Sequence, residues 1–100
     1  MKADRSFSKK DRILMHIEKA RRYLEELDAP RTFSQDGIAE AIGITRAHAA
    51  LELSHLAKAG LVEDARKHVP EKMRQVKMYA PTRAGYELAK ALRAIREMRE

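Results

Sequence analysis

The chain contains no cysteine, and this absence excludes disulfide bonds and thiolate-ligated metal sites. A cysteine-free chain suits a reducing compartment, so we expect a cytoplasmic protein. Apolar runs are only a few residues long, and the N-terminal segment MKADRSFSKKDR is charged with no apolar run behind it. Neither a membrane-spanning helix nor a signal peptide is therefore predicted.

Glycine is also scarce: the four glycines are scattered at positions 37, 43, 60 and 85, and they form no glycine-rich phosphate-binding loop. There is no cysteine nucleophile and no Ser, His and Asp order typical of hydrolases, so we expect neither an enzyme nor a cofactor. Asparagine is absent while charged residues make up 36% of the chain, a profile typical of a thermophilic source.

Only five residues are aromatic, and they are spread along the chain: Phe7, Tyr23, Phe33, Tyr79 and Tyr86. Proteins that bind single-stranded nucleic acid or RNA use clusters of exposed aromatic side chains as stacking platforms. No such cluster is evident, so duplex DNA is the better candidate among nucleic acids.

Basic residues outnumber acidic ones, 21 to 15, for a formal net charge of +6. Residues 1–24 carry eight basic and three acidic side chains, a net charge of +5, and residues 64–79 carry five and two, a net charge of +3. Concentration in two segments favours a polyanionic partner over an evenly solvated surface.

The most informative segment spans residues 34–62 and predicts two short helices joined by a tight turn. Ser34 can cap the first helix, Gly43 supplies the turn, Thr45 can cap the second helix, and Gly60 ends it. One face of the second helix, at i, i+4 and i+7, consists of Ala49, Leu53 and Leu56. A helix-turn-helix over residues 34–59 presents its second helix to a DNA major groove.

The whole chain is predicted to be a single domain, residues 1–100, mainly α with a small β-hairpin (α+β). A first helix begins after Ser8, and its apolar stripe allows two readings: a helix that continues to Asp28, or one that ends near Arg22. Residues 61–80 form a two-stranded hairpin, or wing, and residues 82–100 form a final helix capped by Thr82. The predicted order is helix, helix, helix, strand, strand, helix.

The segments FSQDGIAEAIGITRAHAALELSHLAKAGLV, ARKHV and YAPTRAG resemble the winged helix-turn-helix DNA-binding domains of prokaryotic transcriptional regulators, especially archaeal and MarR-like ones. The resemblance covers roughly residues 10–88. It implies a regulator whose helix 45–59 enters the major groove of double-stranded DNA while a basic wing, residues 66–74, contacts the backbone or adjacent minor groove. It also implies a homodimer through the terminal helices. In one departure, Pro81 precedes Thr82, where members usually have leucine.

The recognition helix, residues 45–59, should point Ala47, Leu51 and Ser54 most directly outward. Its candidate DNA contacts are Thr45, Arg46, His48, Ser54 and His55, and Arg46 is the strongest because it lies in the first turn. Alanine and leucine cannot form bidentate bonds with base edges. We therefore expect phosphate contacts to dominate, with strong salt dependence and moderate sequence selectivity.

The wing supplies the other candidate phosphate contacts, which are Arg66, Lys67, His68, Lys72 and Arg74. They form two basic clusters on either side of one turn, next to the helix-turn-helix. This arrangement favours contact with the DNA backbone over a merely solvated hairpin tip.

The recognition helix also permits two other interpretations. His48, Glu52 and His55 lie at i, i+4 and i+7 and could converge on a metal, but the spacing differs from the H-E-x-x-H motif and no metal is expected. An exposed Leu51 suits a winged-helix protein–protein interaction module within a larger assembly, which is the alternative function. No residue indicates a small-molecule effector.

Overall fold

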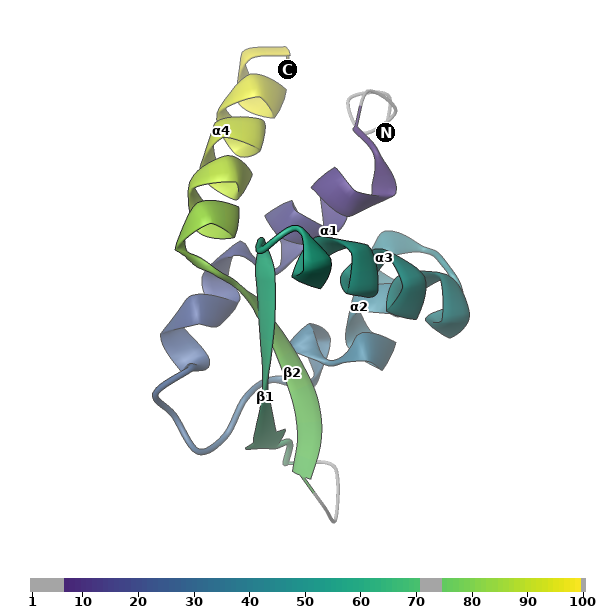
Figure 1. Ribbon diagram of the computed structural model, residues 1–100, viewed down its shortest axis with the longest axis vertical. Coiled ribbons are helices and arrows are strands. Elements are labelled where there is room, and N and C mark those ends of the chain that lie inside the picture. Colours follow the sequence, from purple (N-terminus) through teal and green to yellow (C-terminus); the bar gives the residue numbers. More distant parts are fainter. Residues whose placement is uncertain (1–6, 71–74, 100) are drawn as a thin grey trace.

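The computed structural model describes residues 7–70 and 75–99, and Figure 1 shows their arrangement. The elements are α1 (Lys9–His16), the 3-10 helices η2 (Glu18–Tyr23) and η3 (Arg31–Phe33), α2 (Gln35–Ile42), α3 (Arg46–Lys58), β1 (Val62–His68), β2 (Gln75–Pro81) and α4 (Arg83–Arg99). The predicted order of three helices, a hairpin and a final helix is confirmed, and so is the mainly helical fold class.

Each of the four α-helices begins after a residue with a side-chain hydroxyl, as predicted: Ser8, Ser34, Thr45 and Thr82. Each hydroxyl accepts a hydrogen bond from the backbone N–H three residues on, at 3.0–3.2 Å. These bonds satisfy amides that the first helical turn leaves without partners. Thr82 also donates to the carbonyl oxygen of Gly60 at 2.6 Å, which ties the end of α3 to the start of α4.

The first helix follows the shorter of the two sequence-based readings. The α-helical part ends at His16, and the chain continues as a 3-10 helix to Tyr23, with the amide of Ala20 donating to Ile17 only three residues back. The longer reading, an unbroken helix to Asp28, is wrong. Leu27, which would have continued the apolar stripe, is 88% exposed because the backbone turns away from the core before it.

The wing is an antiparallel pair of strands, in register from Val62 opposite Pro81 to His68 opposite Gln75. Met78 and Ala80 of β2 are buried, while isolated bridges join Ser34 to Met78 and Asp28 to His68. The hairpin therefore rests on the segments that precede α2. It extends from one end of the molecule and α4 rises from the other, with α3 crossing between them (Figure 1).

Helix α4 is held by a close backbone approach to Leu61, just before β1, and by an ion pair with Glu18 of η2. Gly85 faces the carbonyl group of Leu61, where a side chain would overlap the oxygen. Further along, the Arg93 guanidinium donates two hydrogen bonds to the buried Glu18 carboxylate, at 3.0 and 3.1 Å. These bonds raise the pKa of Arg93 above its usual value, because they favour the charged guanidinium.

Gly85→Ala tests this packing, because helix propensity and structure predict opposite signs. Propensity alone would raise the free energy of unfolding by about 1 kcal/mol. We expect a loss of about 2–4 kcal/mol in urea denaturation, since the new methyl group overlaps Leu61. The control Ala91→Gly, at an exposed position of the same helix, should lose only about 1 kcal/mol. A stabilised Gly85→Ala protein would contradict the described backbone approach.

Candidate nucleic-acid interface

Helix α3 buries the face that the sequence predicts and exposes the opposite one. Ala49, Leu53 and Leu56 are 0–2% exposed in the core. On the outward side Ala47, Ser54 and Leu51 are exposed, and Leu51 has 53% of its surface accessible. The centre of the outward face therefore carries the apolar side chains of Ala47 and Leu51, and polar side chains flank them.

The first turn of α3 is held to the first turn of α2. Gly43, with φ of 82°, makes the left-handed turn between the helices, and Thr45 serves as the N-cap of α3. The Nε atom of Arg46 lies 2.6 Å from Oδ1 of Asp36, while the Gln35 side-chain amide donates to the Arg46 carbonyl oxygen at 3.2 Å. Most of the Arg46 side chain stays accessible, so its guanidinium has a defined direction and an open face.

Both histidines of α3 contact the carboxylate of Glu52. The Nε2 atom of His48 lies 3.1 Å from Oε2, and the Nδ1 atom of His55 lies 3.7 Å from Oε1. Within residues 7–70 and 75–99, no three His, Cys, Asp or Glu side chains are arranged to hold a metal ion.

The predicted phosphate contacts of the wing differ in their surroundings. Arg66 is exposed on β1. His68 is half exposed, and its Nδ1 atom lies 3.2 Å from a carboxylate oxygen of Asp28. The predicted contacts Lys72 and Arg74 lie outside the described residues.

The prediction that Lys67 contacts phosphate is wrong, because its side chain points into the protein. It is only 9% exposed, and its Nζ atom donates to the carbonyl oxygens of Leu24 at 2.7 Å and Glu26 at 2.5 Å. Two backbone acceptors compensate the buried ammonium group. Lys67 therefore fastens the loop after η2 to the wing, and its buried ammonium group is turned away from a solvent-side ligand.

Lys77 is a basic residue of the candidate interface that the sequence does not single out. It is exposed on β2 and lines a groove of about 240 Å³ between the wing and the starts of α2 and α3. The other lining residues are Ser34, Gln35, Asp36, Arg46, Val76 and Tyr79. Strand alternation places Lys77 on one face of β2, but only the packing of β2 beside Ser34 brings it next to Arg46.

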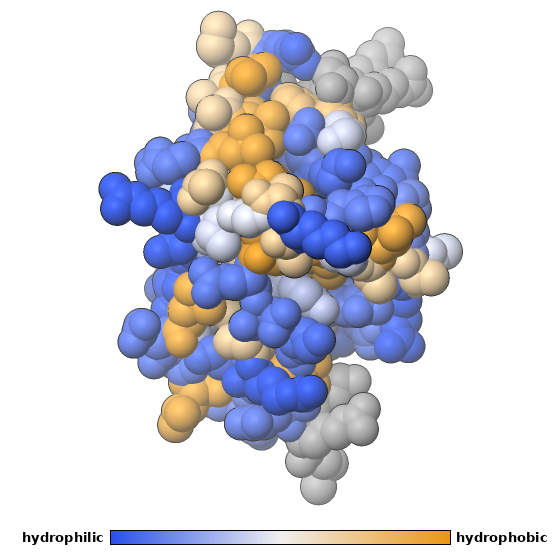
Figure 2. Space-filling model, in the orientation of Figure 1, coloured by the Kyte–Doolittle hydropathy of each residue, from blue (hydrophilic) through white to orange (hydrophobic). Residues whose placement is uncertain are grey.

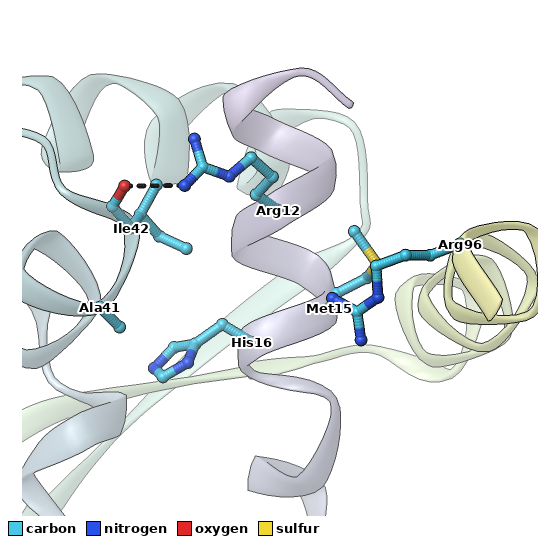
Figure 3. A pocket seen from close by; sticks show the side chains of 6 residues that line it. All are labelled: Arg12, Met15, His16, Ala41, Ile42 and Arg96. Atoms are coloured by element: carbon cyan, nitrogen blue, oxygen red, sulfur yellow. Dashed lines mark hydrogen bonds between the residues drawn. The ribbon is translucent and has the colours of Figure 1, made fainter. Parts of the chain in front are cut away.

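A second hollow, of about 280 Å³, lies among α1, α2 and α4, away from this groove. Figure 3 shows its lining: Arg12, Met15, His16, Ala41, Ile42 and Arg96. Arg12 donates to the Ile42 carbonyl oxygen at 3.0 Å, and Nε2 of His16 lies 2.9 Å from the Thr32 carbonyl oxygen. Its lining comes from three helices, so no local pattern in the sequence indicates it.

Comparisons with known proteins bear on this geometry. The sequence matches no family model and no curated protein. Solved structures do match. MepR, a transcription regulator of the Staphylococcus aureus multidrug efflux pump MepA, aligns over 97% of this chain and 67% of its own with a TM-score of 0.66 and 19% identity. The chain has a winged-helix fold.

Two further matches agree with this winged helix. ZitR of Lactococcus lactis, a zinc-responsive MarR family member, aligns over 92% of this chain and 54% of its own, with a TM-score of 0.63 and 22% identity. MepR in a complex with DNA aligns over 94% of this chain and 68% of its own, with a TM-score of 0.62 and 19% identity. This chain therefore spans about two thirds of the length of the MepR chain and about half of the length of the ZitR chain. Among its described residues, no helix is long and apolar enough to cross a membrane.

Lys67→Met separates the structural role of this lysine from a DNA-contacting one. We expect the free energy of unfolding to fall by about 1–3 kcal/mol, because two partly buried carbonyl oxygens lose their donor. The salt dependence of DNA binding should not change. Arg66→Ala, at the exposed neighbouring position, should show the opposite pattern: unchanged stability and a shallower salt slope. Unchanged stability with a shallower slope for Lys67→Met would restore it as a phosphate contact.

Proposed function

We propose that this winged helix is a DNA-binding transcriptional regulator that places α3 in the major groove of duplex DNA and its wing on the backbone. The observation that carries the proposal is the grouping of Arg46, Lys77 and Arg66 around an exposed helix face. Arg46 starts that helix, Lys77 lines the groove beside it, and Arg66 lies on the adjacent strand. The match to MepR in a complex with DNA supports the DNA-binding part of the proposal.

Phosphate contacts supply most of the affinity in this proposal. The outward centre of α3 carries Ala47 and Leu51, which reach thymine methyl groups but form no hydrogen bonds with base edges. Arg46 is the side chain best placed for a guanine or a phosphate, with Thr45, Ser54, His48 and His55 around it. Selectivity between sequences is consequently moderate, and counterion release dominates.

A salt series on random-sequence duplex tests this function. With about 4–6 phosphates neutralised per protomer, the slope of log affinity against log salt concentration should approach roughly −4 to −5. Arg66→Ala and Lys77→Ala should each reduce the slope by about one and weaken all sequences alike. Lys90→Ala is the control, because Lys90 lies on α4 and is 3.4 Å from Glu87. A flat salt dependence combined with strong preference for one operator would contradict the proposal.

The half-exposed Leu51 favours one alternative, a winged-helix module that binds another protein through α3. The same experiment separates the two functions. Absence of duplex binding even at low ionic strength would leave the protein-binding role in place of the regulator.

We also propose that two copies associate through α4. Within the described residues the exposed large apolar side chains of this helix are Leu88, Ile95 and Met98, spaced along one stripe. Figure 2 shows apolar surface gathered at the end of the molecule where α4 lies. A two-fold pair would present two α3 helices to successive major grooves, about 34–36 Å apart.

Ile95→Glu tests this pairing by placing a charge in the apolar stripe. We expect sedimentation at micromolar concentration to show a dimer for the unaltered protein and a monomer for the variant, since burying an unpaired carboxylate is costly. Leu51→Glu is the matched control: it should leave the dimer intact and weaken DNA binding. A monomeric unaltered protein would remove the expectation of palindromic sites.

A further inference from the structure

Glu52 on α3 is a carboxylate surrounded by groups that carry or can acquire positive charge. Its side chain is only 16% exposed. Besides His48 at 3.1 Å and His55 at 3.7 Å, the Nζ atom of Lys10 on α1 lies 3.9 Å from Oε1. The two histidines flank the outward face of α3, whereas Lys10 belongs to a neighbouring helix, α1.

One oxygen of this carboxylate is unsatisfied. Oε1 of Glu52 is buried, and no described residue forms a hydrogen bond with it. The contacts with His55 and Lys10 are ion pairs, longer than hydrogen bonds. A buried carboxylate oxygen without a donor is costly, and a positive charge on His55 is the change that would compensate it best.

The charged groups on α2, which packs against α3, have partners of their own. On α2, Asp36 is paired with Arg46, and Glu40 accepts hydrogen bonds from Arg31, which lower the pKa of Glu40. Among the described residues of β1, no charged side chain lies within ion-pair distance of the two histidines or Glu52. The net charge of the cluster therefore depends on the two imidazoles, since Lys10 and Glu52 offset each other.

We propose that Glu52 is a positioning residue that turns His48 and His55 into proton-dependent DNA contacts, so that duplex binding strengthens as pH falls from about 8 to about 5.8. When neutral His48 donates its Nε2–H to Glu52, it presents only a lone pair on Nδ1. After taking up a proton from solvent, His48 keeps this bond and gains a second N–H, which donates to a phosphate. Protonation of His55 places a positive charge beside the buried Oε1 and leaves an N–H on its other ring nitrogen to donate to a phosphate. The cluster changes from near zero to about +2 charge. The inference rests on the proposed function.

DNA binding at two pH values tests this proposal. For the unaltered protein on random duplex in about 0.1 M salt, we expect affinity to rise about five- to ten-fold per histidine contact between about pH 8 and about pH 5.8, with a salt slope steeper by about one per contact. In the double variant His48→Gln, His55→Gln the affinities at the two pH values should agree within about two-fold. His68→Gln, which removes the wing histidine, should keep the pH response.

Glu52→Gln keeps the size and hydrogen-bonding atoms of the side chain and removes its charge. We expect the pH at which affinity rises to move downward, because each imidazolium loses its carboxylate partner. In the free protein, the NMR ring titrations of His48 and His55 should move the same way, while His16, which contacts Thr32, should not. Glu87→Gln on α4 is the matched control and should change neither readout. A merely structural role would lower stability without moving either curve.

Three results would overturn the inference while leaving the proposed function standing. These are strong duplex binding that does not vary with pH, a pH response that survives in the double histidine variant, and ring titrations that ignore Glu52→Gln. Failure to bind duplex at low ionic strength at either pH would overturn the proposed function, and the inference with it. The ring titrations, which need no DNA, tell these cases apart.

Discussion

The packing of the inner face of α3 is the constraint on which the rest of the structure depends. Leu53 and Leu56 are each 2% exposed and Ala49 is fully buried, in contact with the core that α1 and α2 also supply. Burial of each leucine contributes about 1.5–3 kcal/mol, so rotation of the helix about its axis would cost a large fraction of the stability of a small domain. That packing leaves Ala47 and Leu51 outward and aligns the start of α3 with the groove beside the wing.

The same packing decides which cations can meet a polyanion. Arg46 and Lys77 belong to different elements, yet both line the groove between α3 and β2. Lys67, in contrast, contributes to the positive charge of its segment but lies buried against backbone carbonyl groups. The charge of a sequence segment is therefore an upper bound on the charge of the surface that it forms. Glu52 reduces the positive charge of the surface further, because two histidines and a lysine lie close to its carboxylate.

Much of the fold follows from short-range patterns. The hydroxyl caps at Ser34 and Thr45 and the left-handed turn at Gly43 were predicted because each involves residues within four positions of one another. The first helix shows where this reasoning becomes insufficient. Its apolar stripe extends to Leu27, but the backbone tightens into a 3-10 helix after Ile17 and the loop beyond is fastened to the wing. Periodicity reports which residues could share a face, not how far the helix continues.

The sequence by itself determined the order of elements, the helix starts and the buried face of α3, since these follow from hydrogen-bonding and packing rules that act between near neighbours. Only the tertiary structure decided which basic side chains stay in solvent. Lys67 meets an acceptor 43 residues away, Lys77 lines the same groove as Arg46, and Glu52 meets Lys10 of another helix. Contacts between residues far apart in the chain leave no periodic trace, because they arise only when separate elements pack against one another.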